Sequence, residues 1–267
     1  MIRRYVLAAA LLLPATLIVA VPDLLYHRSP TAVDLADALR PPSGAHWFGT
    51  DQLGRDVLAR VLHGAAPSWS LGLGATVFAL AGGILLGLLA ALAGRVADHL
   101  LLRATDLLLS LPPLLLALLA VTVLGTGRTN VMLAVAIAFI PVYARMVRSE
   151  VLAVRRSGYV EAAVGLGVPR VVLALRHVVP NTLGPLSVLG TIGFGSAILY
   201  GSGLSFLGLG ARPPAPEWGA MLSEGRSFLA SAWWVGVFPG LAITVSVLAV
   251  TVLGRQFRVH LTGRENR

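Results

Sequence analysis

The chain has 267 residues, of which 56% are apolar and only 12% are charged, and its mean hydropathy is +0.81. A soluble domain carries about 25% charged residues, so this composition excludes an ordinary water-soluble globule. All 21 basic side chains are arginine, and neither lysine nor cysteine occurs. Disulfides and thiolate metal sites are therefore excluded, as are a lysine Schiff base and a Walker A phosphate loop, which needs a lysine.

Six apolar runs approach the roughly 20 residues that a helix needs to cross a bilayer. They cover residues 5–21, 68–93, 107–124, 131–147, 183–209 and 232–253. The first run follows two arginines, as in a secretory signal peptide, but no A-x-A cleavage site precedes the polar stretch after Pro22, which favours a retained anchor. The sequence predicts an all-α integral membrane protein with six transmembrane helices. We expect one domain, residues 1–267, with an anchor helix and extracytoplasmic lateral segment (1–67) and a core (68–258).

The arginines predict the orientation of these helices, because cytoplasmic loops carry the excess of basic residues. One side of the six spans, which includes both termini, holds 14 arginines and 5 acids, and the opposite side holds 7 arginines and 7 acids. Both termini are therefore predicted to be cytoplasmic. The net charge of +9 is explained by the orientation of a protein embedded in membrane lipid. Binding to nucleic acid is not needed to explain it.

The apolar runs lack the ionisable residues that ion-coupled transport requires. Secondary transporters and proton pumps usually place such a residue at mid-membrane, and none of the six runs has an acidic residue near its centre. The six histidines show no H-x-x-x-H pair and no acidic partner at ligand spacing. No catalytic residue, metal site or cofactor is therefore predicted for this chain.

The fifth run is rich in glycine. Small residues let membrane helices approach closely, and glycines also permit bending. Two interpretations stay open here: tight packing alone, or a helix that lines a translocation path and changes shape. The pore-lining candidates are Gly190, Gly193, Ser196 and Tyr200.

A polar segment, residues 148–181, separates the fourth and fifth runs. Residues 159–166 are expected to form a short helix, with Gly167 as its left-handed stop and Pro169 as the first residue of a second helix. Two short helices joined at a glycine predict a compact cytoplasmic knob. Composition alone does not exclude a helix lying on anionic lipid.

The residues of this segment resemble a known motif. Glu161, Ala162, Ala163, Gly167 and Pro180 resemble, in identity and spacing, the EAA loop of ABC importer permeases, although His177 and Val179 stand where that family usually has isoleucine and leucine. The sequence of residues 176–181, RHVVPN, resembles the dipeptide, oligopeptide and nickel branch. In this family the loop forms coupling helices that dock on a cytoplasmic ATPase. The resemblance implies coupling residues at Tyr159, Glu161, Ala162, Ala163, Gly165, Gly167, Arg170 and Pro180.

Two segments predicted on the other side of the membrane from this loop support the same resemblance. Residues 46–68 and 203–226 are similar to segments of the C-type subunit of peptide permeases. In the first, Val57, Leu58 and Val61 share a helix face, and Asp56 and Arg60 are spaced for an i,i+4 pair on another. We expect this segment to be a helix lying along the outer membrane surface.

The resemblance implies a permease subunit of an ATP-driven importer in the bacterial cytoplasmic membrane, which forms half of a path for short peptides. Its implied partners are a second, similar permease, a cytoplasmic ATPase that uses the ATP, and an extracytoplasmic solute-binding protein. The subunit itself would not be an enzyme. The alternatives are a nickel-chelate or other small polar solute, an ion-driven secondary transporter, and a membrane-anchored scaffold.

Overall fold

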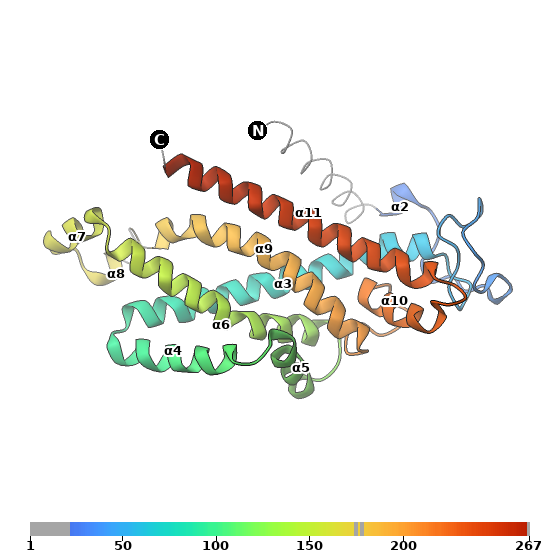
Figure 1. Ribbon diagram of the computed structural model, residues 1–267, viewed down its shortest axis with the longest axis horizontal. Coiled ribbons are helices and arrows are strands. Elements are labelled where there is room, and N and C mark those ends of the chain that lie inside the picture. The colour runs from blue at the N-terminus through green and yellow to red at the C-terminus, as the bar shows by residue number, and fades with distance from the viewer. Residues whose placement is uncertain (1–21, 174–175, 177–178, 266–267) are drawn as a thin grey trace.

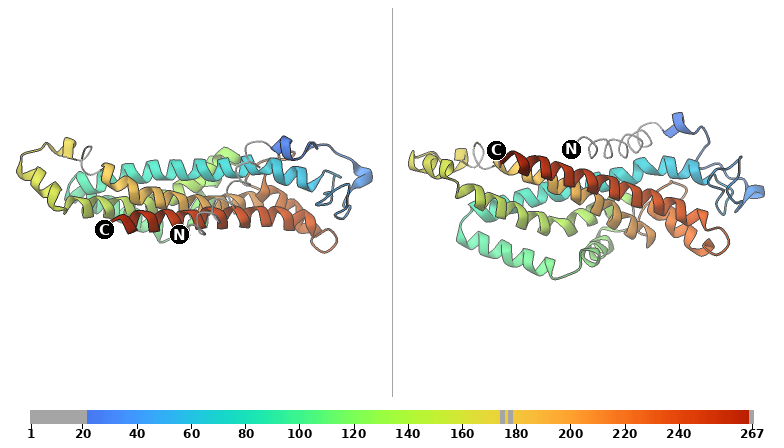
Figure 2. Two further views of the ribbon diagram at one scale, coloured as in Figure 1. Left: turned by 90° about the horizontal axis from the view of Figure 1, so that it is seen from above. Right: turned by 45° about the horizontal axis from the view of Figure 1, so that its top comes forward.

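The computed structural model describes residues 22–265 except 174–175 and 177–178. Four long helices run side by side along the long axis of the molecule (Figure 1 and Figure 2). They are α3 (Val57–Leu92), α6 (Arg128–Arg155), α9 (Val179–Phe206) and α11 (Trp234–Glu265). The described part contains helices and no β-strand, as the sequence predicts. The predicted first span, residues 5–21, lies outside the described residues.

All four long helices are long and apolar enough to cross a membrane. The predicted third span, 107–124, is wrong as a single helix. The chain instead forms α4 (Arg95–Leu109) and α5 (Pro113–Leu124), which are bent by 96° relative to each other. Pro112 lacks an amide hydrogen and disfavours helix at the residue before it, so the double proline ends one helix and begins the next. The described residues thus hold four spans, or five if the bent pair is counted as one.

Glycines on α3 set how closely its neighbours pack. A side chain at Gly87 would contact Val147 of α6, and one at Gly72 would contact Ile198 of α9, each within 3 Å. Gly83 similarly faces the Cβ of Tyr143. Lipid tails are as apolar as leucine, so membrane helices associate through such close packing rather than through hydrophobic burial. The glycines of α3 place this helix at the centre of the bundle.

The helix α3 begins eleven residues before the predicted span and is one helix of 36 residues. At 1.5 Å per residue it is about 54 Å long, well beyond the ~30 Å of a hydrocarbon core. The expected separate helix on the outer surface is therefore wrong. Val57 and Val61 are instead buried against Trp218 and Trp234, because their apolar face contacts protein rather than lipid.

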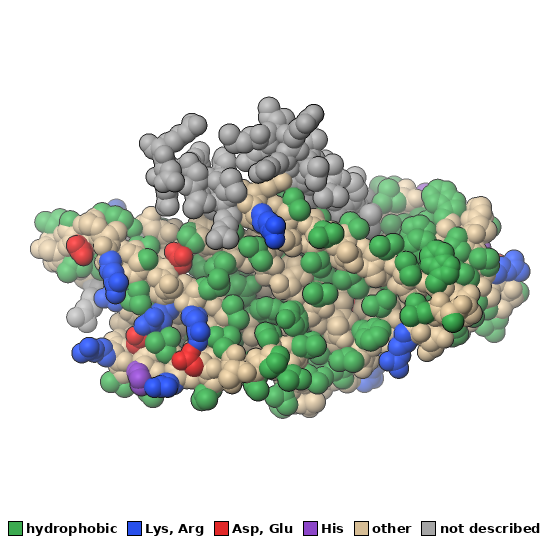
Figure 3. All heavy atoms as spheres, in the orientation of Figure 1, with side chains coloured by type: hydrophobic (Ala, Val, Ile, Leu, Met, Phe, Trp, Pro, Cys, Tyr) green, Lys and Arg blue, Asp and Glu red, His purple; other side chains and the backbone are tan. Residues whose placement is uncertain are grey.

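Short elements gather at the two ends of the bundle. One end holds α7 (Gly158–Gly165) and α8 (Arg170–Leu173); the other holds α2 (Pro22–Leu25), η1 (Leu35–Asp37), α10 (Trp218–Gly225) and η3 (Arg226–Phe228). Figure 3 shows most of the charged side chains toward the two ends, with apolar side chains over most of the middle. This distribution fits a bundle whose middle lies in lipid.

Candidate functional site at the two ends of the bundle

We call α7, α8 and their connection, residues 158–173, the knob. Its small apolar core consists of Val160, Ala163 and Leu173. Gly167 has a φ of +76°, a conformation that glycine adopts without strain, and it reverses the chain between the two helices. The predicted left-handed glycine is confirmed. The second helix begins at Arg170, one residue after the proline that the sequence placed first.

The knob exposes a surface on α7. Glu161, Ala162 and Gly165 are exposed, as are two large apolar side chains, Val164 at 58% and Leu166 at 85%. Isolated exposed apolar residues are ordinary, but here they adjoin a charged residue on one short helix at the tip of the molecule. The knob therefore presents a mixed surface, and nothing in the described part of this chain covers it.

The remaining predicted coupling residues have different positions. Tyr159 is half exposed at the start of α7, whereas Ala163 is buried inside the knob and holds α7 against α8. Pro180 is exposed in the first turn of α9. Arg170 begins α8, and its side chain lies outside the described part. The exposed coupling candidates are thus brought together on α7, with Pro180 one segment further along the chain.

The pore-lining candidates lie on α9, and three of them pack against other helices. A side chain at Gly193 would overlap the hydroxyl of Tyr143 on α6, and one at Gly190 would lie 2.9 Å from Leu80 on α3. Tyr200 packs edge-on against Phe139, with ring centroids 5.2 Å apart. Ser196 is half-buried. Close packing explains both glycines, so a pore-lining role for this group stays a prediction.

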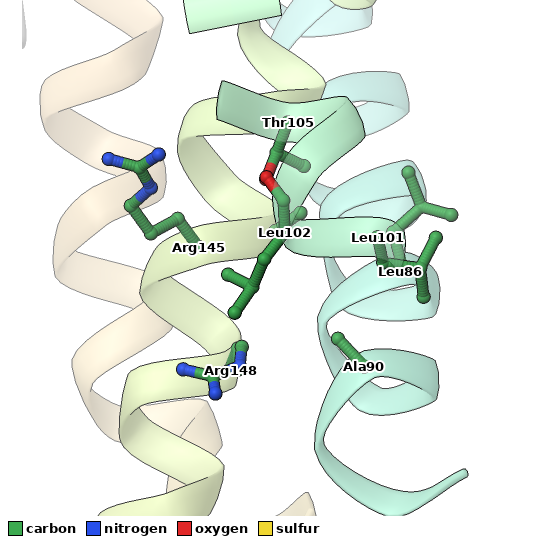
Figure 4. Close-up of a pocket in the computed structure, with 8 residues that line it drawn as sticks. Leu86, Ala90, Leu101, Leu102, Thr105, Arg145 and Arg148 are labelled. Carbon is green, nitrogen blue, oxygen red and sulfur yellow. The ribbon is translucent and has the colours of Figure 1, made fainter. Parts of the chain in front are cut away.

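A small groove lies between α3, α4 and α6 (Figure 4), with Leu86, Leu102 and Thr105 among the residues that line it. Two arginines of α6, Arg145 and Arg148, are among its lining residues, and each is paired with an aspartate of α4. Arg148 binds Asp98 through two bonds, of 2.5 and 2.7 Å, and Arg145 pairs with Asp106. These pairs fasten α4 to α6, so the groove is a structural feature of the helix packing.

The opposite end contains what we call the cap, which comprises residues 46–60 and α10. Four charged side chains meet inside it, and we call Asp51, Arg55, Arg60 and Glu224 the charge cluster. Arg55 donates to Asp51 at 2.6 Å and to Glu224 at 2.9 Å. Arg60 donates to the same Glu224 oxygen at 3.1 Å, and its Nε lies 3.5 Å from Asp51 Oδ2. Two positive and two negative charges therefore balance, with Asp51, Arg55 and Arg60 buried and Glu224 partly exposed.

The sequence missed this cluster because it paired Arg60 with the wrong residue. Asp56 is the N-cap of α3 and accepts from the amide of Ala59 at 2.9 Å. Its other carboxylate oxygen accepts from the Tyr26 hydroxyl at 2.9 Å and lies 2.8 Å from Nδ1 of His46. Arg60 instead reaches α10. The sequence did contain one indication of the cluster: charged residues occur in both segments that resemble the peptide permeases, residues 46–68 and 203–226.

Two tryptophans add hydrogen bonds between the parts of the cap and the neighbouring helices. The Trp218 indole donates to the carbonyl of Val61 at 2.8 Å, and its backbone amide donates to Ser68 at 3.1 Å. The Trp234 indole donates to the carbonyl of Thr50 at 3.0 Å. Buried indole N–H groups usually find such partners, and these bonds fix α10 and α11 to the first turns of α3 and the loop before it.

Glu217 is a buried carboxyl group at the N-terminus of α10. It accepts from the amides of Gly219 and Ala220, at 3.0 and 3.2 Å. Burial raises the pKa of Glu217, and these two hydrogen bonds partly oppose that shift. The described residues contain no group of three or more His, Asp or Glu side chains that could hold a metal.

Residues 83–266 match the family described as binding-protein-dependent transport system inner membrane component. The chain belongs to this family, and it is a multi-pass membrane permease subunit of an ABC transporter. The predicted family resemblance is confirmed.

Curated relatives include permeases named for dipeptide, D,D-dipeptide and glutathione transport. The dipeptide transport system permease protein DppC of Alkalihalophilus pseudofirmus is 42% identical over 84% of this chain and 73% of its own length. The probable D,D-dipeptide transport system permease protein DdpC of Escherichia coli is 44% identical over 86% and 77%. The glutathione transport system permease protein GsiD of Shigella flexneri is 46% identical over 81% and 72%.

A solved structure has the same fold. The chain matches an inward-facing structure of the MetNI methionine ABC transporter with a TM-score of 0.60, covering 74% of this chain and 95% of that one, at 16% identity. At this identity the likeness concerns the fold alone, which is that of an ABC importer permease.

Proposed function

We propose that this chain forms half of a translocation path for short peptides in an ATP-driven importer. The support for a peptide substrate is that relatives at 42–46% identity are named for dipeptides, D,D-dipeptides and glutathione, all of which are short peptides or peptide-like molecules. A second homologous permease would form the other half, and an extracytoplasmic solute-binding protein would deliver the solute. Nickel chelates are the competing substrate class.

The observation that carries the coupling role is the exposed α7 surface of the knob. It lies at the end of the bundle where α4 begins and α6 ends (Figure 1). Arg95, Arg155 and Arg156 stand at these helix ends, so the positive-inside rule makes this end cytoplasmic. Both termini would then be cytoplasmic. Glu161 would make the polar contact with a cytoplasmic ATPase, and the small side chain of Ala162 would permit close approach.

The knob is also well placed to transmit motion. It follows α6 directly and precedes α9 by a few residues, so a displacement of the knob acts on two of the four long helices. ATPase closure would move the knob and switch these helices between inward- and outward-open states as rigid bodies. ATP and the loaded binding protein must favour different states, because a ligand with equal affinity for both shifts nothing.

A bulky substitution on the exposed surface tests the coupling role. Ala162→Trp adds a large side chain that the free chain tolerates, because this position faces solvent, but that would block close approach. We expect much less ATPase to co-purify with the variant chain and ATP-dependent uptake to fall. Ala104→Trp is the matched control, because Ala104 is exposed on α4 away from the knob. Undiminished ATPase association in Ala162→Trp would contradict the assignment.

The substrate class needs its own experiment. Proteoliposomes containing the complete transporter and its binding protein would be offered a labelled dipeptide, the corresponding free amino acids, or a nickel–histidine chelate. We expect ATP-dependent uptake of the dipeptide alone. Uptake of the nickel chelate without the dipeptide would replace the peptide proposal by the competing one.

A further inference from the structure

The α4–α5 pair differs from the four long helices because it is broken. The chain leaves α4 after Leu109, bends by 96° and begins α5 at Pro113. With 12 residues, α5 is about 18 Å long, so it cannot cross a ~30 Å hydrocarbon core by itself. Because α4 runs along the bundle (Figure 1), α5 lies across it.

The break between the two helices lies near the middle of the bundle. Asp106, in the last turn of α4, pairs with Arg145, which stands a little past the midpoint of α6. Beyond the break, Ala117 and Val121 of α5 belong to one buried cluster with Ala75, at the midpoint of α3. Figure 1 likewise shows α5 about halfway along the molecule. In a bundle whose middle lies in lipid, the break and α5 are therefore at membrane depth.

Backbone groups at the break have no partners within the described residues. The prolines at 112 and 113 carry no amide hydrogen, and the amides of Leu114 and Leu115 donate no hydrogen bond there. The carbonyl oxygens of Ser110 and Leu111 accept none from the described part either. All four residues are exposed. Hydrocarbon offers such groups no hydrogen bonds, so irregular backbone at membrane depth occurs only where protein or water covers it.

The opposite end of α5 shows how this chain can satisfy a helix end by itself. There the side-chain amide of Asn130 donates to the carbonyl of Leu124 at 2.7 Å. At the break, the Ser110 hydroxyl only bonds back to the carbonyl of Leu107 in α4. The partners missing at the break are therefore expected to come from another chain or from water.

The exposed face of α5 distinguishes between these two. Leu115, Leu119 and Val123 are spaced four residues apart on one face of the helix, and we call them the α5 stripe; their exposed fractions are 49%, 55% and 87%. Thr122, the only polar residue of α5, donates its hydroxyl to the carbonyl of Leu119 at 2.6 Å. A water-filled path presents hydrogen-bonding groups to its solute, whereas this stripe is apolar. An apolar surface beside unpaired polar groups is typical of a protein interface.

The position of α5 along the bundle selects the partner. The proposed ATPase lies beyond the cytoplasmic end and the proposed binding protein beyond the opposite end, so neither reaches the middle. Among the proposed partners, a second permease alone lies in the membrane beside this chain. We propose that the α5 stripe and the α4–α5 break form the contact with the second permease, which supplies the hydrogen bonds missing at the break. This inference rests on the proposed function, which supplies the partner.

A spin label can report what covers the α5 stripe, because the chain contains no cysteine and an introduced cysteine is its only thiol. Leu119→Cys is labelled in the complete complex with cysteine-free partner subunits in lipid nanodiscs. Leu248→Cys is the matched control, because this leucine has a similar exposed fraction, 57%, on α11, which lies across the bundle from α5 (Figure 1 and Figure 2). Electron paramagnetic resonance then measures collisions with oxygen, which concentrates in lipid, and with a neutral nickel chelate, which stays in water.

We expect oxygen to reach the label of the Leu248→Cys variant, and neither agent to reach the label of the Leu119→Cys variant. Oxygen collisions at position 119 as frequent as those at position 248 would overturn the proposal, because lipid would then cover the α5 stripe. Frequent collisions with the nickel chelate at position 119 would also overturn it, because the stripe would then line a water-filled path.

A photo-crosslink identifies the covering protein. The same two variants are labelled with benzophenone maleimide and irradiated in the complete complex. From Leu119→Cys we expect a covalent product between this chain and the second permease, and from Leu248→Cys no such product. Absence of the product from Leu119→Cys would overturn the assigned partner, as would a product with the ATPase, with the binding protein or with another copy of this chain.

The two proposals fail in different ways. If the proposed function is wrong, no second permease co-purifies with the wild-type chain and no ATP-dependent uptake occurs. If only the proposed interface is wrong, the complex assembles and takes up solute, but the label at position 119 is open to oxygen or to the nickel chelate.

Discussion

The knob and the cap lie at opposite ends of one helix bundle and are held together by different interactions. The knob has a core of three apolar side chains, one left-handed glycine and an exposed face on α7. The cap has a cluster of four charges, three of them buried, and indole hydrogen bonds to backbone carbonyls. The knob's contacts are almost all local in sequence, whereas those of the cap join distant segments.

This difference indicates different mechanical roles. Few buried contacts and exposed backbone are typical of the least stable parts of a protein, so the knob can adapt its shape to a partner. Directional bonds between buried charges permit one arrangement only, so the cap preserves its internal geometry. One end is suited to forming a new interface and the other to keeping an existing one.

The largest expected effect tests the rigidity of the cap. Asp51→Asn keeps the shape of the side chain but leaves two buried arginines facing one carboxylate. Removing one partner of a buried pair costs about 3–5 kcal/mol, so we expect a lower thermal unfolding temperature in detergent, measured by circular dichroism. Arg40→Met, at the exposed Arg40–Asp37 pair, should change stability by less than about 1 kcal/mol. If both substitutions lowered the unfolding temperature equally, the charge cluster would not be the more rigid element that the comparison of cap and knob requires.

A smaller effect is expected in the knob. Gly167→Ala places a side chain at a φ of +76°, which costs about 1 kcal/mol or slightly more and should raise amide hydrogen exchange of residues 158–173 about fivefold. Gly165→Ala is the control, because its position is equally open and has no positive φ, and alanine favours the helix. Exchange in the cap should stay unchanged; a rise there would show that the two ends are not independent.

The smallest effect concerns Glu217 in the cap. Burial raises the pKa of this carboxyl group in the folded state, so its protonated form favours folding, and that contribution is lost as the pH rises through the folded-state pKa. Glu217→Gln keeps an oxygen acceptor for the α10 amides but removes the titration. The unfolding temperature of the wild type relative to this variant should therefore increase as the pH is lowered from 8 toward 5. A difference that is independent of pH would show that Glu217 does not titrate in this range.

The sequence predicts the long helices well, because apolar runs of sufficient length leave few alternatives in a membrane. Two boundaries were wrong for physical reasons. The polar residues Arg60 and His63 and the proline at 67 lower the hydropathy of the first turns of α3, although protein contacts bury those turns. The double proline at 112–113 breaks the third run, whereas single prolines at 141, 185 and 239 lie inside continuous helices.

The candidate sites were predictable where they are local. The short helix, the left-handed glycine and the start of α8 follow from residues close together in the chain. The charge cluster was not predictable, because spacing suggested a partner for Arg60 four residues away and its actual partner is Glu224. The glycines of α9 show a similar limit, since the pattern does not distinguish a residue facing a path from one that accommodates Tyr143.

The length of α3 has a consequence for both ends. This single helix of about 54 Å is much longer than the ~30 Å thickness of a hydrocarbon core and carries the cap on its first turns. At this length, each degree of tilt about the end near the knob displaces the opposite end by about 1 Å. A rotation of a few degrees started near the knob would therefore carry the cap sideways by several ångströms.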